Sequence, residues 1–177
     1  MISTTLRSDA LHETRRINIY LPPNYVNGRH YPAVFMADGE NVDGYAALAE
    51  QLVRQHRMRP VVIVGAVSGQ SGIVEDRAAL HIDDLRHADY LPNHPGAGDR
   101  FERHLRFFCH ELTAYARRTY GVSSRRRDRA VTGASDGGVF ALEAGLRCGN
   151  QFATAWPMSG GQFEARNRHC PQPKRAS

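Results

Sequence analysis

Apolar segments of strand length alternate along this sequence with segments of helical periodicity, and this order constrains the fold more than any other feature. The first strand segment alternates apolar with polar residues, and the later ones are more continuous apolar runs. In chain order they are Ile17–Leu21, Tyr31–Ala37, Pro60–Val67, Ala130–Ala134 and Phe152–Met158. Continuous apolar strands are typical of a sheet that is buried on both faces. The sequence therefore predicts strands at the centre of a layered α/β domain.

Helical patterns occupy the spaces between these strands. Apolar residues recur every three or four positions over residues 46–53, 101–116 and 139–146. The alternation of strand and helix predicts right-handed βαβ units, and so a mostly parallel sheet with helices on both faces. The exception is the stretch from Ser68 to Gly98, which lacks clear periodicity. Loops of this length are uncommon unless they are functional.

The size and charge of the chain fit one domain and exclude several functional classes. The chain has 177 residues, of which 41% are hydrophobic, and this suits a single globular domain. Its longest apolar run, Val61–Val67, is far shorter than the roughly 18 residues that a membrane span needs, and its first residues lack the features of a secretion signal. We therefore expect a cytoplasmic protein without a membrane partner. The net charge is +5, but four of these charges lie in residues 165–177, so nucleic acid is not an expected partner.

Neither the cysteines nor the histidines predict a disulfide, a metal or another cofactor. The cysteines are odd in number and lie far apart without CxxC spacing, so we expect reduced thiols at Cys109, Cys148 and Cys170. One segment combines imidazole and carboxylate side chains, which are common zinc ligands. Its residues are His81, Asp83, Asp84 and His87. Their spacing on an irregular loop is unspecific, and we expect a solvated loop instead of a metal site.

The segment Gly133–Gly137 (GASDG) has the pattern G-x-S-x-G and lies between a predicted strand and a predicted helix. A serine at such a strained turn projects its hydroxyl above the sheet edge, and the glycines prevent collisions with the neighbouring helix and strand. The start of the helix adds main-chain donors and the positive end of its dipole. We therefore expect Ser135 to be a nucleophile. The alternatives are a glycine-rich tight turn and a phosphate-binding turn, but the usual glycine-rich phosphate motifs are absent from the sequence.

A serine that accepts an acyl group also needs an oxyanion hole. Its donors are usually the amide of the residue after the serine and a second amide from the loop after an earlier strand. Here Asp136 follows the serine, and Asp38-Gly39-Glu40 follows the strand segment at 31–37. Gly39 would let the chain turn so that a following amide faces the site. An ordinary turn explains Asp38 and Gly39 equally well.

Seven segments, in the same order and spacing, resemble the putative-esterase family of α/β-hydrolases. They are RINIYLPPNY at 16–25, YPAVFMADG at 31–39, RHADYLP at 86–92, GDRF at 98–101, FCHELTAYARRTY at 108–120, RAVTGASDGG at 129–138 and FATAWPMSGG at 152–161. The family includes esterase D, enterochelin-esterase-like and feruloyl-esterase-like enzymes and the mycolyltransferases. The similarity spans residues 15–161 and is far more specific than the serine motif alone.

The resemblance implies a fold and a set of site residues. The fold is the α/β-hydrolase fold. Ser135 is then the nucleophile, and the main-chain amides of Asp136 and Glu40 form the oxyanion hole. The residues that the resemblance places along the approach to the site are Arg86, Asp89 and Tyr90.

The end of the sequence departs from that family. There, the acid and the histidine of the catalytic triad follow later strands, whereas this sequence ends sixteen residues after Gly161. We expect residues 1–161 to form a hydrolase domain that lacks its last strands, and residues 162–177 to form a basic polar tail. His169 is the best-placed base, with Glu164 near enough in sequence to orient it, but a histidine in a disordered tail is the favoured interpretation.

The missing strands have a consequence for the last strand segment, at 152–158. It becomes a sheet edge with unpaired backbone groups and uncovered apolar surface, which favours self-association. We therefore expect a homo-oligomer. Trp156, the only tryptophan, is expected to pack in the core.

By resemblance, the function is hydrolysis of a small-molecule carboxylic ester through an acyl-enzyme on Ser135, without a cofactor. We expect a low rate, because the triad acid and histidine are absent from their usual places and a serine without a base is a poor nucleophile. The alternatives are a non-catalytic or vestigial hydrolase-fold binding domain, and an acyltransferase that uses the same residues with another acceptor.

Overall fold

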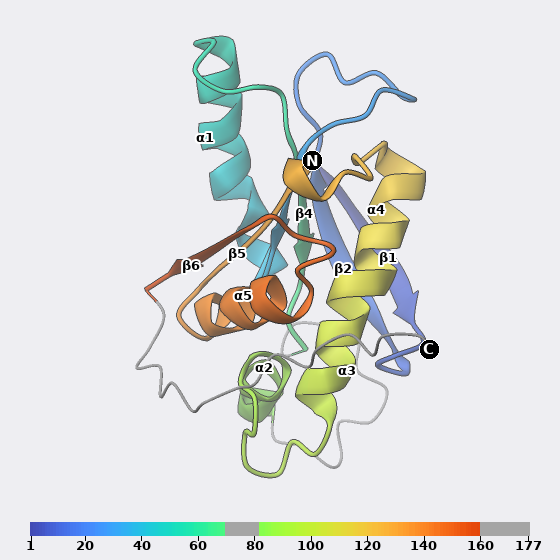
Figure 1. Cartoon of the computed structure of the whole chain (residues 1–177), viewed down its shortest axis with the longest axis vertical. Coiled ribbons are helices and arrows are strands. Elements are labelled where there is room, and N and C mark those ends of the chain that lie inside the picture. Colours follow the sequence, from blue (N-terminus) through green and yellow to red (C-terminus); the bar gives the residue numbers. More distant parts are fainter. Residues whose placement is uncertain (70–81, 160–177) are drawn as a thin grey trace, which may run out of the picture.

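The computed structural model describes residues 1–69 and 82–159 (Figure 1). Over these residues, one six-stranded sheet has the strand order β1-β2-β4-β3-β5-β6. The strands are β1 (Ile2–Ser8), β2 (Glu13–Tyr20), β3 (Ala33–Met36), β4 (Val62–Ala66), β5 (Arg129–Ala134) and β6 (Thr154–Met158). All five predicted strands are present. The sequence analysis missed β1, because it contains few apolar residues and most of its positions are exposed or half-buried.

The sheet is mixed, with an antiparallel part and a parallel part. β1 pairs antiparallel with β2, and β2 pairs antiparallel with β4. β4, β3, β5 and β6 run parallel to one another. This arrangement confirms the predicted α/β class. Because β3 and β5 are parallel neighbours, the loops that follow them emerge at the same edge of the sheet, where open α/β sheets bind their ligands.

Helices cover both faces of the sheet (Figure 1). They are α1 (Val42–Arg54), α2 (Ile82–Tyr90), α3 (Arg100–Arg106), α4 (Thr113–Tyr120) and α5 (Asp136–Arg147), together with a π-helical segment η2 (Phe107–Leu112) and the short 3-10 helices η1 (Gly39–Asn41) and η3 (Arg126–Asp128). The three predicted helical patterns correspond to α1, to the continuous segment α3-η2-α4, and to α5. Within the described ranges, no helix combines the length and apolar character that a membrane span requires.

α2 corrects the expectation of an irregular loop from Ser68 to Gly98. The helix buries one face against the rest of the protein, and the buried residues are Leu85, Ala88, Asp89 and Tyr90. One of these positions is a carboxylate that pairs with arginines, so apolar residues alone did not reveal the helical period. Residues 70–81 of this stretch lie outside the described part of the chain.

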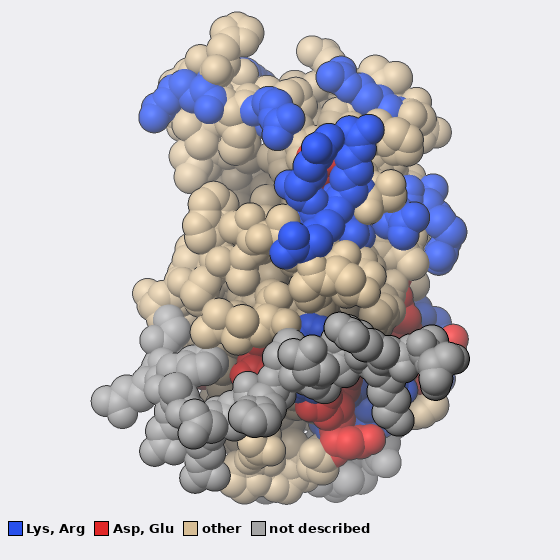
Figure 2. Space-filling model, viewed as in Figure 1, with Lys and Arg blue, Asp and Glu red and all other residues tan. Residues whose placement is uncertain are grey.

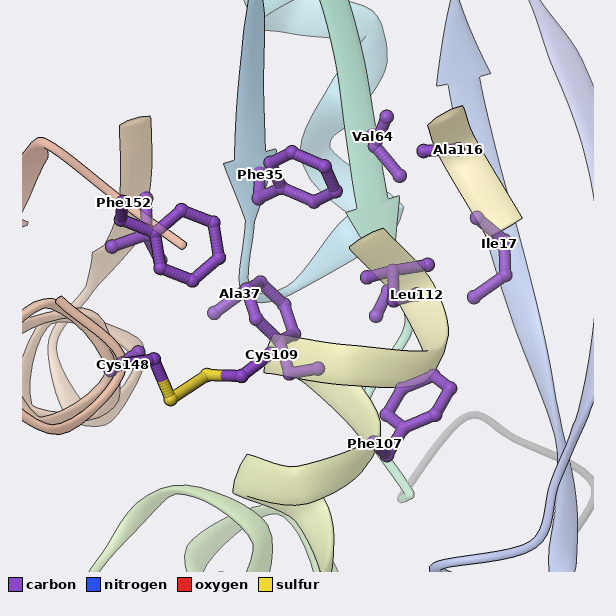
Figure 3. Packing of buried hydrophobic residues seen from close by; sticks show 14 of the residues in the cluster. Ile17, Phe35, Ala37, Val64, Phe107, Cys109, Leu112, Ala116, Cys148 and Phe152 are labelled. Atoms are coloured by element: carbon purple, nitrogen blue, oxygen red, sulfur yellow. A yellow bond between two sulfur atoms is a disulfide. The ribbon is translucent and has the colours of Figure 1, made fainter. Parts of the chain in front are cut away.

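The alternation of side chains along the strands divides the core between the two faces. In β3, Phe35 belongs to the cluster beneath α3-η2-α4 and α5, whereas Met36 belongs to the cluster beneath α1. Figure 3 shows Phe35 near Phe152 and on the same side as Leu112; the rings of Phe35 and Phe152 meet edge to face at 5.5 Å. The helices thus fix the strand ends from which the candidate site is built.

A disulfide joins Cys109 and Cys148, so the expectation of reduced thiols is wrong for these two cysteines (Figure 3). Cys109 lies in η2, Cys148 follows α5, and both are buried. The two residues are 39 positions apart, and the packing of η2 and α5 on one face of the sheet brings their Cα atoms to 6.3 Å. The spacing of cysteines along the sequence carries no sign of this contact. Cys170 lies outside the described residues.

β6 forms one edge of the sheet, as predicted for the last strand segment. The prediction that Trp156 packs in the core is wrong, because 63% of this residue is exposed. It borders an apolar cavity of about 420 Å³ between α1 and the sheet, together with Leu48 of α1 and Met36 of β3. α1 covers this cavity from one side only, so the apolar surface that lines it is open to solvent. Self-association through the β6 edge stays a prediction.

Candidate active site

Ser135 lies at the sharp turn between β5 and α5, where the sequence predicts it. Its φ is 54° and its ψ is −122°, a conformation that is costly for a residue with a side chain, and the residue is exposed. Glycine is required on either side of the turn. A Cβ on Gly133 would lie 2.2 Å from the carbonyl oxygen of Gly137, and one on Gly138 would lie 2.9 Å from the carbonyl oxygen of Met158. The turn therefore holds a serine in a strained and accessible position.

The main chain around Ser135 is anchored on both sides. The Ser135 amide donates to the Met158 carbonyl at 3.0 Å, and the Ser135 carbonyl accepts from the Gly138 and Val139 amides at 2.9 and 3.1 Å. Asp136 is the first residue of α5, and the amides of a helix's first turn have no acceptor within the helix. The Asp136 amide is therefore available as a donor at the positive end of the helix.

The loop after β3 provides the second candidate donor. Asp38 has a left-handed φ of 55° and precedes η1. A Cβ on Gly39 would lie 2.4 Å from the carbonyl carbon of Gly65, so glycine alone allows the loop to pack this closely on β4. Burial raises the pKa of the Glu40 carboxyl, which accepts hydrogen bonds from its own amide and from the Ser68 amide. In this conformation the Glu40 amide has its own carboxylate as an acceptor.

A cavity of about 450 Å³ lies between these two loops. Its lining includes Ala134, which precedes the serine, and Asp38 and Glu40 from the other loop. Tyr45 of α1 also lines it, and nothing in the sequence analysis pointed to that residue. The cavity is thus a pocket at the carboxyl ends of two parallel strands, next to an exposed serine.

Arg86, on α2, contacts both loops. Its Nε and Nη2 donate to the two carboxylate oxygens of Asp38 at 2.7 and 2.8 Å, and its Nη1 donates to Asp136 Oδ2 at 3.0 Å. His87, the next residue of α2, places Nε2 3.1 Å from the same Asp136 oxygen. The sequence analysis considered His87 only as part of a possible metal site. Among the described residues no group of histidine, cysteine and carboxylate side chains could hold a metal ion, and His81 and the side chains of Asp83 and Asp84 lie outside them.

The comparisons with known proteins agree with this geometry. Residues 8–165 match the family described as Putative esterase. The chain belongs to this family. Its sheet and helices also superpose on three solved structures. A ferulic acid esterase shares 21% identity at a TM-score of 0.71, over 90% of this chain and 58% of that one. An IroE-like serine hydrolase from Shewanella oneidensis shares 27% identity at a TM-score of 0.65, over 82% of this chain and 46% of that one. The enterobactin esterase FES from Shigella flexneri shares 20% identity at a TM-score of 0.64, over 94% of this chain and 39% of that one.

These superpositions confirm the α/β-hydrolase fold for the described part of this esterase-family chain. They also show that the chain spans between about two fifths and three fifths of the length of these structures. The predicted base His169, its orienting partner Glu164 and the whole of residues 162–177 lie outside the described residues. Their predicted roles stay predictions, as does the division of the chain at residue 161.

Two residues that the resemblance placed along the approach are buried. Asp89 and Tyr90 are fully buried, and their expected contact with substrate stays a prediction. Asp89 accepts from Arg15 Nη2 at 3.0 Å, from Arg100 Nε at 2.8 Å and from the Gly69 amide at 2.8 Å. Burial alone would raise the pKa of the Asp89 carboxyl, but Arg15 and its other cationic neighbours lower it to about 2. Asp89 is therefore a buried anion, and its bonds to other segments hold α2 in place.

Glu13 completes this buried ionic cluster. It contacts Arg15, and it accepts from Arg100 Nη2 at 3.1 Å. His104 packs beside the cluster, with Nδ1 3.9 Å from Asp89 Oδ1. Burial lowers the pKa of His104 to about 3 although Asp89 acts in the opposite direction. A sequence signal was available, because Glu13 and Arg15 occupy inward positions of β2 in the same alternation as Ile17 and Ile19.

A group of exposed arginines lies at the other end of β5 from the serine turn. Figure 2 shows a group of basic side chains in the upper half of the view; two arginines lie in η3, before β5, whereas Ser135 follows that strand. Arg59, Arg125 and Arg127 line a cavity of about 660 Å³ there. The arginines at 125–127, directly before β5, are exposed.

Proposed function

We propose that this chain hydrolyses small-molecule carboxylic esters, with Ser135 as the nucleophile. The single observation that carries the proposal is the exposed serine with φ 54° at a turn from strand into helix, beside a pocket at the sheet edge. Membership of the esterase family supports the same chemistry. The solved structures of esterases and hydrolases with this fold are consistent with it.

The proposed reaction has two steps. Ser135 Oγ bonds to the carbonyl carbon of the ester while its proton passes to a base, and the resulting oxyanion is stabilised by the amides of Asp136 and Glu40. For the second donor to act, the Glu40 carboxylate must move away from its own amide. The alcohol then leaves with a proton, and water cleaves the acyl-enzyme to release the acid and regenerate the serine.

The base determines how fast this reaction runs. His169 is the base proposed from topology, and His87 is the described histidine that contacts Asp136 next to the nucleophile. A serine site without its triad still retains about 10³-fold catalysis over water from the oxyanion hole and binding. We therefore propose weak activity. His169→Ala and His87→Ala distinguish the two candidates, since only loss of the true base lowers the rate.

We expect Ser135→Ala to reduce hydrolysis of a short p-nitrophenyl ester to the uncatalysed rate, because the alanine has no oxygen to acylate. Release of p-nitrophenol measures the effect, and circular dichroism confirms the fold. Ser124→Ala is the matched control, since Ser124 is an exposed serine that precedes β5 at the opposite end of that strand. Full turnover by Ser135→Ala would refute the nucleophile.

Two other functions remain distinguishable in the same assay. A folded wild-type chain with no activity above background would favour the non-catalytic binding domain over the esterase. An acyltransferase would pass the acyl group to an added alcohol in preference to water, and product analysis by mass spectrometry separates the two acceptors.

A further inference from the structure

We propose that Arg86 is a positioning residue that holds the two donor loops of the oxyanion hole in register. The proposal rests on the proposed function, because it concerns the same site. The loop after β3 and the turn after β5 are separated by almost a hundred residues in the sequence, and within the described residues α2 supplies a side chain that bonds to both. The resemblance to known esterases placed Arg86 along the substrate approach instead.

The acceptors of Arg86 flank the proposed oxyanion-hole donors directly. Asp38, which lies two residues before Glu40, receives a bidentate pair of hydrogen bonds. Asp136, which supplies the other donor amide, receives the bond from Nη1. Nη2 also approaches the Ala134 carbonyl, immediately before the nucleophile, at 3.5 Å. One planar guanidinium therefore sets the distance between the two loops, a geometry that a lysine cannot reproduce.

The donors of Arg86 are occupied by the protein. A guanidinium has five N–H groups, and four of its hydrogen bonds in this structure go to Asp38, Asp136 and Ala134. The side chain is only 21% exposed. Hydrogen bonding to Asp38 raises the pKa of Arg86, so the group stays cationic. These contacts favour an action on the loops over direct recognition of a substrate.

We call the hydrogen bonds from Arg86 to Asp38 and Asp136 the clamp. The positive charge of Arg86 gives the clamp a second effect. The carboxylates of Asp38 and Asp136 both lie beside the place where the oxyanion would form, and each would raise the energy of that negative charge. Arg86 pairs with both and offsets them. Without it, the carboxylates would also repel each other and push the two loops apart.

α2, the helix that carries Arg86, is itself held in place by contacts with the rest of the protein. The Tyr90 hydroxyl accepts from the Asp38 amide at 2.8 Å, and the Arg86 guanidinium lies 5.2 Å from the centre of the Tyr90 ring. Asp89, between these contacts, is fixed by the buried arginines Arg15 and Arg100. The position of Arg86 is thus set by the core of the protein.

The kinetic test uses Arg86→Gln and Arg86→Lys with a p-nitrophenyl ester. Removal of one oxyanion-hole donor costs about 10²–10³ in rate in other enzymes, and displacement of the donors should lower kcat here about 10- to 100-fold with KM changed less than about threefold. Arg86→Lys should restore little of the loss, because it keeps the charge but not the fork. A raised KM with unchanged kcat would show substrate binding and overturn the proposal.

The matched control is Arg147→Gln. Arg147 lies on α5 and forms a similar bidentate pair with Glu102, at 2.8 and 2.5 Å, on the surface. This variant removes an arginine–carboxylate fork without touching either loop, so kcat should be unchanged. Asp136→Asn, which weakens the same clamp with little change in shape, should lower kcat, and its effect should not add to that of Arg86→Gln.

A second readout does not depend on turnover. In Arg86→Gln, the amides of Asn41 and Ser135, which donate to the Asp38 and Met158 carbonyls, should exchange with deuterium at least about tenfold faster, whereas amides in β4 should be unaffected. Unchanged exchange at both amides would overturn the clamp, even in a chain that hydrolyses esters. If exchange accelerates but Ser135→Ala retains full activity, the clamp holds its loops and the proposed esterase function fails separately.

Discussion

Replacing Asp89 with asparagine is expected to lower the free energy of unfolding by about 3–5 kcal/mol, the usual cost of removing one partner from a buried ion pair. The carboxylate is fully buried and bonds to Arg15, Arg100 and the Gly69 amide. The asparagine keeps the shape of the side chain but removes its charge. Glu13 would then face two buried guanidinium groups alone. Urea unfolding followed by circular dichroism measures the loss.

The matched control for this change is Asp99→Asn. Asp99 pairs with Arg103 at 2.9 Å, but its side chain is 73% exposed, and exposed pairs contribute less than about 1 kcal/mol. An Asp89→Asn variant as stable as Asp99→Asn would contradict the role given to the buried cluster.

The Asp89 effect also has a defined pH dependence. The folded-state pKa is about 2, below the unfolded value of about 3.9. A depressed pKa contributes stability that is fully present above pH ~4 and is lost as the pH falls towards 2. The stability difference between wild type and Asp89→Asn should therefore be constant above this window and shrink within it. His104 destabilises both proteins as the pH falls below about 6.5, because the unfolded histidine binds the proton first.

Reduction of the Cys109–Cys148 disulfide is expected to lower the free energy of unfolding by about 4 kcal/mol. The bond closes a segment of 39 positions, and a cross-link of that length restricts the unfolded chain by roughly this amount. The measurement compares urea unfolding of the same protein with and without a phosphine reductant, so no cavity is introduced. Cys170→Ser in both samples prevents disulfide exchange.

The prediction fails in either of two ways. Equal unfolding curves in the oxidised and reduced samples would show that the bond adds no stability. Alkylation of both Cys109 and Cys148 in the unfolded, unreduced protein would show that the bond is absent.

The sequence predicted the strands and the turn that carry the site, because these elements follow from local patterns of residues. Apolar runs identified β3 and β5, and the glycines around Ser135 identified the turn between β5 and α5. Both features depend on residues close together in the chain. That β3 and β5 are neighbours in the sheet was not predicted, because β4 lies between them in the sequence.

The parts that the sequence analysis missed depend on contacts between distant segments. Arg86 bonds to residues 48 and 50 positions away, and Asp89 to one 74 positions away. The disulfide and the exposure of Trp156 likewise depend on how the folded helices and strands pack against one another. No spacing rule reveals such contacts, because tertiary packing alone creates them. α2 was missed for the same reason, since a buried charge interrupts its apolar face.

The proposed function requires that Ser135 carry a reactive hydroxyl at the pocket between the two loops. A fluorophosphonate probe tests it most directly, because its phosphorus bonds to an activated serine oxygen with release of fluoride and a proton. Intact-mass and peptide mass spectrometry should show one adduct, on Ser135, that is absent from Ser135→Ala. A folded protein that stays unmodified, or that is modified only at other residues, would contradict the account.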